Sequence, residues 1–479
     1  MEWIASGSDK KIATKKGRVR VRITFHGATR QVTGSAHLLE IGKHRVLLDC
    51  GLHDHDRVDP NSLNREFLFD PRTLDAVILS HAHNDHIGRL PRLVRQGFKG
   101  HIYCTHATGD ITGVMLRDSA RIQKNDWAHA QATNHYLTDP LFELIDVEHV
   151  IDQIRRIDYL LPTEILPGLN MTYHDAGHIL GSAMIELKFQ EDGRDRKFVF
   201  TGDLGRRNMG LLPDPSILSG MDILVSESTY GGKVLEPYDV LLKRLHAILA
   251  RAHRKRGRVI IPAFSLGRTQ RLIYCLQELF YRYRVKPMPI YVDSPLSTRL
   301  TDIHRDFPDA YTPEARRLMD RDDEYFGSRY VEVCQTPEDS RRLNYHSGPM
   351  IVIASSGMCD AGRVRHHLLH AVQEEANAVV IVSYQAEGTL GRKLVDGQRD
   401  LKILDRDVQV RCPVYVLDGF SGHADADDLA WWYEQTGGGI ETAFLVHGEP
   451  ASMEAIAPTL QKYVKNTVIM PEYGSIHEV

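Results

Sequence analysis

One short stretch constrains the fold and the chemistry of this chain more than any other: residues 80–88, which read SHAHNDHIG. The apolar run AVILS leads into this stretch, and apolar residues recur at helical spacing after it. Such a change of period indicates a buried strand followed by a helix, with the polar residues on the loop between them. The loop carries three histidines and an aspartate within six positions, namely His81, His83, Asp85 and His86.

Three explanations for this concentration of imidazole are open: a metal site, a pH-sensitive surface loop, or chance in a chain with 25 histidines. His81 and His83 lie two positions apart on an extended segment, so their side chains point to the same side. Asp85 and His86 lie where the helix begins and can face a second ion. Zinc accepts imidazole and carboxylate ligands, and a catalytic zinc needs about three protein ligands. The loop alone supplies two ligands per metal, so a metal site requires further residues.

Further ligand candidates each follow an apolar strand: His178 in DAGHILGSA, Asp203 in FTGDLG and His447 in FLVHGE. If Asp203 bridges two ions with its two oxygens, each metal has four protein ligands. Two divalent ions about 3.5–4 Å apart can activate water and stabilise the charge that develops on a phosphate. Ordinary structural roles, such as a hydrogen-bonded core histidine or a turn aspartate, remain the alternatives. The predicted sets are His81, His83, His178 and Asp203 for one metal, and Asp85, His86, Asp203 and His447 for the other.

Length and composition bound the class of protein. A chain of 479 residues is too long for one ordinary core, so two or three domains are expected. No apolar run approaches the roughly 20 residues needed to cross a bilayer, and the N-terminus is polar and basic, unlike a secretion signal. The six cysteines lack any CxxC pair, which predicts reduced thiols and a cytoplasmic protein. With a net charge of −4, a polyanionic partner requires a local basic patch or bound metals.

Strands and helices alternate from about residue 235. The stretch DVLLKRLHAILARAHR is an amphipathic helix, and RVIIPAFSLGRTQRLIYCLQELF reads as strand, glycine turn and helix. Two further units, PIYVDSPLSTRL and PMIVIASSGMCDAGRVRHHLLHAV, repeat this order, and AVVIVSYQ adds a strand. Strands separated by helices of crossover length predict a parallel, doubly wound sheet.

Several of these stretches together resemble a known family. VLLDCG, SHAHNDHIG, AGHILGSA and FTGDLG are similar to the four successive motifs of the metallo-β-lactamase fold. SESTYGG, GFSGHAD and FLVHGE resemble motifs A, B and C of the β-CASP nucleases of that fold, and PAFSLGRTQ, VDSPL and SSGMCDAGR are similar to segments of their inserted domain. The resemblance covers about residues 21–475, and a set of seven ordered motifs is highly specific. The resemblance implies the same two sets of metal ligands that follow from giving each metal four protein ligands.

The resemblance implies an α/β fold, a metallo-β-lactamase αββα sandwich with an inserted, doubly wound parallel-sheet β-CASP domain. His423 and His447 would then belong to a site that is otherwise built by the first half of the chain. The expected divisions are residues 1–231 for the first part of the lactamase-like domain, with a basic arm at 1–20, residues 232–411 for the β-CASP domain, and residues 412–479 for the C-terminal part of the lactamase-like domain.

The resemblance also narrows the substrate. A histidine at position 447 is typical of the RNA-processing branch, whereas the DNA-repair branch typically has valine there, so RNA is favoured. The short N-terminal arm and the absence of a C-terminal extension fit neither the archaeal members with KH domains nor RNase J. In this layout the chain resembles stand-alone members akin to the endonuclease subunit of the pre-mRNA 3′-end processing machinery.

The expected chemistry is hydrolysis of phosphodiester bonds by a hydroxide that bridges two zinc ions, because zinc lowers the pKa of bound water to about 7. The expected catalytic residues are His423, Glu227 and Asp203; His423 would protonate the leaving 3′-oxygen, and Glu227 would orient its ring. Asp49 is expected to orient a metal-binding histidine rather than to bind metal. The alternatives are an ordinary helix-start histidine at 423 and a carboxylate at 227 that caps a strand loop.

RNA is expected to lie between the domains, a usual place for binding sites. Arg268 follows a glycine at a strand-to-helix turn, which suits an anion site at a helix N-terminus, although a salt bridge between domains is an equal alternative. The basic cluster at 363–367 is equally well explained as a solvated helix face. The expected RNA contacts are Arg268, Ser355, Ser356, Gly357, Arg363, Arg365, His366 and His367.

We therefore interpret the sequence as a zinc-dependent ribonuclease with two zinc ions per chain, acting on single-stranded RNA in RNA processing or decay. The rivals are a hydrolase of small esters or thioesters, a DNA nuclease of the same family, and a non-catalytic RNA-binding subunit. Endonuclease versus 5′-exonuclease cleavage, RNA sequence preference, partner complexes and the oligomeric state stay open, with a homodimer as one candidate.

Overall fold

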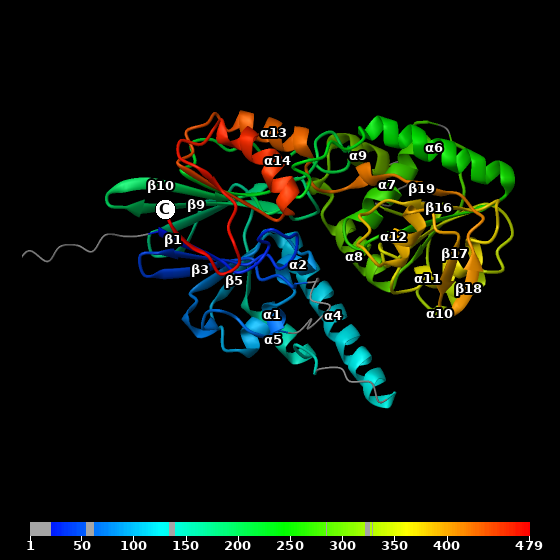
Figure 1. Cartoon of the computed structure of the whole chain (residues 1–479), viewed down its shortest axis with the longest axis horizontal. Coiled ribbons are helices and arrows are strands. Elements are labelled where there is room, and N and C mark those ends of the chain that lie inside the picture. The colour runs from blue at the N-terminus through cyan, green and yellow to red at the C-terminus, as the bar shows by residue number, and fades with distance from the viewer. Residues whose placement is uncertain (1–20, 54–61, 134–138, 284, 321–325, 328) are drawn as a thin grey trace, which may run out of the picture.

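The computed structural model describes residues 21–53, 62–133, 139–283, 285–320, 326–327 and 329–479. The expected basic arm at 1–20 lies outside the described residues. Within them the chain forms two seven-stranded sheets, one six-stranded sheet and a two-stranded hairpin. Figure 1 shows two lobes: the seven-stranded sheets lie together in one lobe, and the six-stranded sheet lies in the other.

The first seven-stranded sheet begins as an antiparallel meander and continues as parallel strands. Its strands, in order across the sheet, are β22 (Ile476–Glu478), β1 (Val21–Phe25), β2 (His37–Ile41), β3 (His44–Leu48), β4 (Ala76–Ile78), β5 (His101–Cys104) and β6 (Ile154–Arg156). β3, β4, β5 and β6 pair in parallel. The carboxyl ends of β3 and β4 therefore meet at one edge, where Asp49 and the SHAHNDHIG loop follow.

The second seven-stranded sheet has the same arrangement along the chain, with its antiparallel strands first and its parallel strands later. In order across the sheet they are β21 (Val468–Ile469), β20 (Thr442–Val446), β11 (Ile223–Glu227), β10 (Arg194–Phe200), β9 (Ala183–Glu191), β8 (Leu169–Asp175) and β7 (Thr163–Leu166). β10, β11 and β20 pair in parallel, and β8 runs in the same direction because both β8 and β10 are antiparallel to β9. Four strands thus end at the same edge.

These two sheets pack face to face and are covered by helices on their outer faces. Apolar residues of both sheets, such as Phe25, Leu48, Phe200 and Phe444, share the inner core. One group of helices covers the first sheet, and a pair covers the second. The predicted αββα sandwich is confirmed. The covering helices are α2 (Asn84–Ile87), α3 (Leu90–Arg95), α4 (His106–Ala132) and α5 (Leu144–Gln153) on the first sheet, with α1 (Ser62–Arg65) nearby, and α13 (Ala426–Gln435) and α14 (Pro450–Gln461) on the second.

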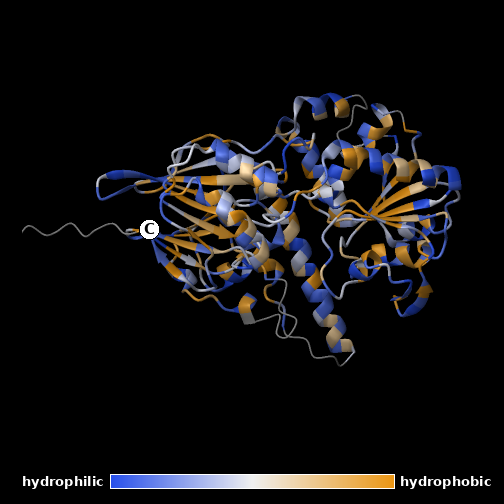
Figure 2. Ribbon diagram, turned by 45° about the horizontal axis from the view of Figure 1, so that its top comes forward, coloured by the Kyte–Doolittle hydropathy of each residue, from blue (hydrophilic) through white to orange (hydrophobic). Residues whose placement is uncertain are grey.

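The six-stranded sheet is parallel throughout, as the alternation of strands and helices predicts. Its strands, in order, are β14 (Val331–Val333), β13 (Ile290–Asp293), β15 (Met350–Ala354), β12 (Arg258–Pro262), β16 (Ala378–Ile381) and β19 (Val414–Val416). In Figure 2 the central strands are apolar and have helices on both faces, which is the environment of a buried parallel sheet. β19 lies just beyond residue 411, so the last strand of this sheet comes from chain that we expected to have left it.

The helices of this second lobe cover both faces of its sheet and carry a hairpin at one end. They are α6 (Tyr238–Lys255), α7 (Arg268–Tyr281), α8 (Pro295–Asp306), α9 (Pro313–Met319), α10 (Pro337–Leu343), α11 (Val364–Ala371) and α12 (Leu390–Val395). The hairpin consists of β17 (Asp400–Ile403) and β18 (Arg406–Gln409). No helix among the described residues has both the length and the apolar composition that a bilayer-spanning segment requires.

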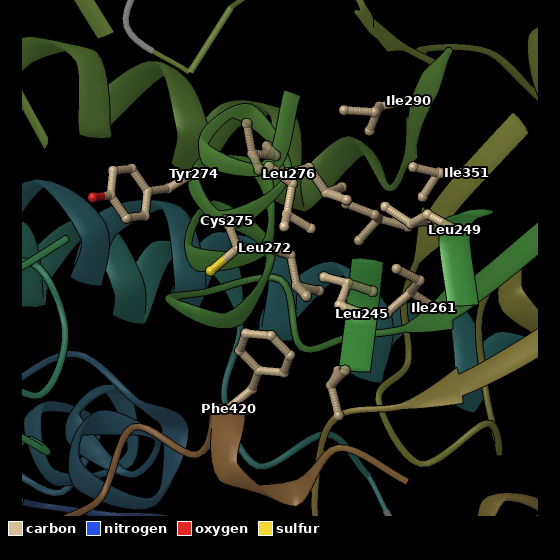
Figure 3. Close-up of a cluster of buried hydrophobic side chains, with 14 of the residues drawn as sticks. Leu245, Leu249, Ile261, Leu272, Tyr274, Cys275, Leu276, Ile290, Ile351 and Phe420 are labelled. Carbon is tan, nitrogen blue, oxygen red and sulfur yellow. The ribbon is translucent and has the colours of Figure 1, made fainter. Parts of the chain in front are cut away.

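One core cluster of the second lobe reaches the segment that carries His423. Side chains of α6 and α7, such as Leu245 and Leu272, pack against Ile261 of β12 and against neighbouring strands (Figure 3). Phe420, the last residue of the 3₁₀ turn η4 (Asp418–Phe420), is fully buried in the same cluster. Because Phe420 lies three residues before His423, the packing of the second lobe helps to fix the position of that loop.

Candidate active site

The predicted site residues converge at the edge of the sandwich where strands from both sheets end. They lie at the ends of strands that are far apart in the sequence, so the topology of the sheets brings them together. The placements are Asp49 after β3, His81 to His86 after β4, His178 after β8, Asp203 after β10, Glu227 at the end of β11, and His447 after β20.

A first cluster of potential metal ligands consists of His81, His83, His178 and Asp203. His83 Nδ1 lies 3.0 Å from His81 Nε2 and 3.3 Å from His178 Nε2. Asp203 Oδ2 lies 3.4 Å from His81 Nε2 and 3.6 Å from His178 Nε2. In a tetrahedral zinc site with bonds of about 2.0–2.1 Å, the ligand atoms are about 3.3 Å apart. The first cluster therefore has the dimensions of one zinc site.

A second cluster is formed by Asp85, His86 and His447, with the other oxygen of Asp203 completing it. His447 Nε2 lies 3.2 Å from His86 Nε2 and 3.3 Å from Asp85 Oδ2. Asp203 Oδ1 lies 3.4 Å from His86 Nε2 and 3.6 Å from His447 Nε2. These separations again match the spacing of ligand atoms around one tetrahedral ion.

Asp203 lies between the two clusters and turns one oxygen toward each. Its carboxylate is buried, and neither oxygen has a hydrogen-bond partner among the described residues. Burial raises the pKa of this carboxyl, but His447, His86 and His81 outweigh burial and hold the pKa well below its usual range. A buried carboxylate without hydrogen bonds is very unfavourable unless a cation compensates its charge. The two oxygens of Asp203, which lack hydrogen-bond partners among the described residues, therefore suit a positively charged group in each ligand cluster.

Asp49 contacts the outer side of His86, as the sequence predicts for an orienting residue. His86 Nδ1 lies 2.7 Å from Asp49 Oδ2, so the ring donates a hydrogen bond there and keeps Nε2 directed at the second cluster. The backbone N–H and the hydroxyl of Ser80 both donate to Asp49 at 2.8 Å. Thr229 contacts His447 in a similar way, because Thr229 Oγ1 lies 3.0 Å from His447 Nδ1. The sequence contains no signal for Ser80 or Thr229 beyond their position within the motifs.

His423 and Glu227 form a pair beside Asp203. His423 Nδ1 lies 3.3 Å from Glu227 Oε1 and 3.7 Å from Asp203 Oδ2. Glu227 is fully buried and accepts hydrogen bonds from the backbone N–H groups of Leu204 at 2.6 Å and Thr229 at 3.2 Å. Burial lowers the pKa of His423, but Glu227 and Asp203 outweigh burial and raise the pKa above its ordinary value. Because its side chain is 20% exposed, His423 is accessible to a bound molecule.

Arg271 of α7 is a buried residue of this site that the sequence does not identify. Its guanidinium donates to the carbonyl oxygen of Ser421 at 3.0 Å and to that of His178 at 3.4 Å. The hydrogen bonds and ion pairs of the described residues give Arg271 no carboxylate partner. A helix of the second lobe thus holds two loops of the first lobe, those of His178 and His423. The separations of 93 and 150 residues explain why no local pattern reveals these contacts.

Two of the predicted RNA-contact residues are instead engaged inside the second lobe. Arg363 Nη1 donates to Asp293 Oδ1 at 2.6 Å, and His367 Nε2 lies 2.6 Å from Asp293 Oδ2. Asp293 and His367 are buried, and Ser340 also donates to Asp293. Neither the predicted phosphate contact nor the alternative of a solvated helix face describes His367, because its ring is enclosed by this network.

The remaining predicted contacts lie where strands of the parallel sheet end. Arg268 begins α7, and its guanidinium donates to the carbonyl of Val382; burial and Arg271 lower its pKa to about 10. Its hydrogen-bond partner is therefore a carbonyl of its own lobe rather than an acid of the other. Ser355, Ser356 and Gly357 follow β15, and Ser355 Oγ lies 2.8 Å from Ser265 Oγ. In α11, Arg365 is half-buried and His366 is exposed.

A sandwich of this topology, with two His/Asp clusters joined at one aspartate, defines a metal-dependent hydrolase of the metallo-β-lactamase type. Three family models match successive parts of the chain: "Metallo-beta-lactamase superfamily" at residues 29–262, "Beta-Casp domain" at 269–394 and "Zn-dependent metallo-hydrolase RNA specificity domain" at 407–471. The chain belongs to the β-CASP family of the metallo-β-lactamase superfamily.

Curated relatives match this chain over nearly its whole length. Ribonuclease TTHA0252 of Thermus thermophilus is 36% identical, with 92% of this chain and 96% of the relative covered. The transcription termination factor FttA of Methanocaldococcus jannaschii is 31% identical over 95% of this chain and 71% of the relative. An RNase J-like protein of the same organism is 30% identical over 95% of this chain and 99% of the relative.

A solved structure shares the fold at low sequence identity. It is a protein of unknown function from Enterococcus faecalis V583, with a TM-score of 0.58 and 13% identity, covering 96% of this chain and 100% of the other.

Replacing Arg271 by alanine is expected to lower kcat for RNA, the expected substrate, by about 10-fold to 100-fold while KM stays within about twofold. The reason is that the loops of His178 and His423 lose a charged hydrogen-bond donor. Because the change leaves a cavity of guanidinium shape, millimolar methylguanidinium should restore much of the rate. Steady-state kinetics with and without methylguanidinium measure both effects.

Arg282 is the matched control, because it lies at the far end of α7 with a side chain that is 42% exposed. Arg282→Ala should have wild-type kinetics and no response to methylguanidinium. An unchanged kcat in Arg271→Ala would contradict the positioning role.

Proposed function

We propose that this protein is a zinc-dependent ribonuclease that hydrolyses phosphodiester bonds of single-stranded RNA. The observation that carries the proposal is Asp203, a buried carboxylate with one oxygen toward each of two ligand clusters and with the His423–Glu227 pair beside it. Support for RNA comes from the match to an RNA specificity domain at residues 407–471 and from relatives named as a ribonuclease and as RNase J-like.

We propose two zinc ions per chain. The first would be held by His81, His83, His178 and Asp203, and the second by Asp85, His86, Asp203 and His447. When bound, zinc supplies Lewis acidity and lowers the pKa of a coordinated water to about 7. The residues around the ligands would keep the rings in place: Asp49 and Ser80 fix His86, and Thr229 fixes His447.

His423 would donate a proton to the leaving 3′-oxygen of the cleaved phosphodiester. Glu227 holds Nδ1 of His423, so that the opposite nitrogen can point toward substrate. Glu227 itself is held by two backbone N–H groups, so its carboxylate cannot turn away from His423. Asp203 would contribute as the shared ligand of both metals.

RNA would contact the second lobe through Arg268, Ser355, Ser356, Gly357, Arg365 and His366. Arg363 and His367 would support this edge through Asp293 rather than touch RNA. We keep the first domain boundary at residue 231 and move the second from residue 411 to the end of β19, because β19 belongs to the six-stranded sheet. A cytoplasmic location is supported by six buried cysteines without a disulfide, and a homodimer remains a proposal without a structural argument.

The protein should cleave a single-stranded RNA and leave a thioester panel and the matching DNA uncleaved. One RNA labelled at either end, prepared with a 5′-phosphate and with a 5′-triphosphate, reports substrate, polarity and dependence on the 5′ end in one assay. Chelation of zinc and the Asp203→Asn variant should each abolish cleavage, because both remove the shared metal site. Thioester hydrolysis without RNA cleavage would overturn the proposal, and cleavage that survives metal removal would overturn the mechanism.

The zinc content of single-ligand variants should reveal two separate sites. Wild-type protein is expected to contain two zinc ions per chain, His178→Ala and His447→Ala about one each, and Asp203→Ala fewer than one, because only Asp203 serves both clusters. Inductively coupled plasma mass spectrometry gives the counts, with circular dichroism to verify folding. His366→Ala, an exposed histidine of the second lobe, is the control that should keep two ions. One zinc in the wild type would contradict the two-metal assignment.

His423→Ala should slow cleavage by about 10²–10⁴-fold without loss of zinc, because the leaving oxygen lacks its proton donor. An RNA with sulfur in place of the leaving 3′-oxygen needs no such proton, so on this substrate the variant should approach the wild-type rate. Single-turnover rates on the two substrates test the assignment. An equal defect on both would show that His423 is not the general acid.

A further inference from the structure

Two large aromatic side chains lie exposed at the carboxyl edge of the six-stranded sheet. Phe264, two residues after β12, is 39% exposed, and Tyr384, three residues after β16, is 55% exposed. The carboxyl edge of an open parallel sheet is the usual location of a ligand site in α/β proteins. Exposed aromatic rings at such an edge are therefore candidates for contact with a ligand.

The two rings follow adjoining strands, and the loops that carry them contact one turn. β12 and β16 pair in parallel with Ile260 opposite Val379, which carries Phe264 and Tyr384 to neighbouring positions beyond the ends of the strands. The ring of Phe264 lies against Gly357, since a Cβ at that position would be 3.2 Å from two ring carbons. Gln385, the residue after Tyr384, donates to the carbonyl of Gly357 at 2.9 Å.

The backbone that carries these rings is fixed by hydrogen bonds. Thr269 Oγ1 donates to the carbonyl of Phe264 at 2.8 Å. The side-chain amide of Gln385 also donates to the carbonyls of Ser383 at 3.0 Å and Tyr384 at 2.9 Å. Rings that are presented on a fixed backbone lose little conformational freedom when a ligand binds, which favours affinity.

The start of α7 links the loop that carries Tyr384 to the active site. Arg268 donates to the carbonyl of Val382 in that loop, and Arg271, one turn later, donates to the carbonyls of Ser421 and His178. The hydroxyl of Tyr384 has a pKa raised by burial and also by the charges of Glu449 and Tyr230, two residues of the first lobe. The ring of Tyr230 lies 6.2 Å from that of His423, centroid to centroid. Arg268, whose guanidinium contacts the residue two positions before Tyr384, adds a positive charge near this loop.

This combination suits a nucleobase better than a small apolar ligand. Every base has a flat π-face that stacks on an aromatic ring, and proteins that bind single strands combine such rings with positive charge for the backbone. Stacking requires an unpaired base, so these rings would select single-stranded RNA over a duplex without reading a particular sequence.

We propose that Phe264 and Tyr384 form a stacking subsite on the inserted domain for an unpaired nucleobase next to the cleaved phosphodiester of RNA. The inference rests on the proposed ribonuclease function and extends it by assigning residues that distinguish single strands from duplexes. Gly357 belongs to the same subsite, because a Cβ at this position would press against the ring of Phe264.

The first test compares Tyr384→Ala and Phe264→Ala with the wild type in RNA cleavage. Loss of one stacking ring is expected to raise KM by roughly 5- to 150-fold with little change in kcat. Tyr384→Phe, which keeps the ring and removes the hydroxyl, should behave as the wild type. Tyr345→Ala is the matched control, because this tyrosine of the same lobe is 88% exposed and lies away from the carboxyl edge.

The second test uses a set of RNAs that each carry one abasic nucleotide at a successive position around the cleavage site. For the wild type, one or two positions should raise KM as much as the loss of a ring does. In Tyr384→Ala the same abasic positions should have no further effect, because the stacking partner is already absent. Tyr384 is exposed, so this variant should fold even if Phe264→Ala does not.

The outcomes separate the two proposals. If the wild type does not cleave RNA at all, the proposed function fails. If the wild type cleaves RNA but Tyr384→Ala has unchanged KM, or if abasic positions weaken binding equally in the variant and the wild type, the stacking subsite is wrong and the ribonuclease assignment stands.

Discussion

The arrangement of this active site depends on one buried carboxylate. Neither oxygen of Asp203 has a hydrogen-bond donor among the residues that the structure describes, and imidazole nitrogens of five histidines lie within 3.7 Å of it. An isolated charge of this kind in the protein interior would be strongly destabilising. Its environment favours compensation by positive charge close to its two oxygens. The neighbouring histidines are arranged at ligand spacing around the positions where such cations would sit.

Bringing these groups together requires the β-sandwich topology. The second sheet places β8, β10, β11 and β20 with their carboxyl ends at one edge, although they are separated by up to some 270 residues of chain. The first sheet brings the SHAHNDHIG loop to the same edge from β4. Between β11 and β20 the chain builds the whole six-stranded sheet, so the second ligand cluster joins residues from before and after the inserted domain.

Local patterns predicted much of this site, because metal chemistry imposes short spacings and needs specific residue types. The loop from His81 to His86 was recognisable for that reason, and the strand-then-acid pattern identified Asp203. Contacts between residues that are far apart in the sequence leave no such local pattern. Nothing in RVRHHLLHAV shows that Arg363 and His367 bind the buried Asp293, and nothing in SLGRTQR shows that Arg271 holds loops of the other lobe. The expected boundary after residue 411 left β19 out of the parallel sheet, because no local pattern shows which sheet a strand joins.

The helix α7 connects the two lobes in a way that bears on how the enzyme would couple binding to catalysis. Its first residue, Arg268, lies at the edge where RNA is proposed to bind, and Arg271, one turn later, holds the carbonyls of His178 and Ser421. Gly267 lies close to Ile179, so a shift of the start of α7 would press on the loop of His178, a proposed metal ligand. Phe420 adds a second connection, because it is buried in the core that α7 helps to build. If RNA displaced the second lobe, His178 and His423 would therefore move together. Substrate binding can adjust the geometry of the site through α7.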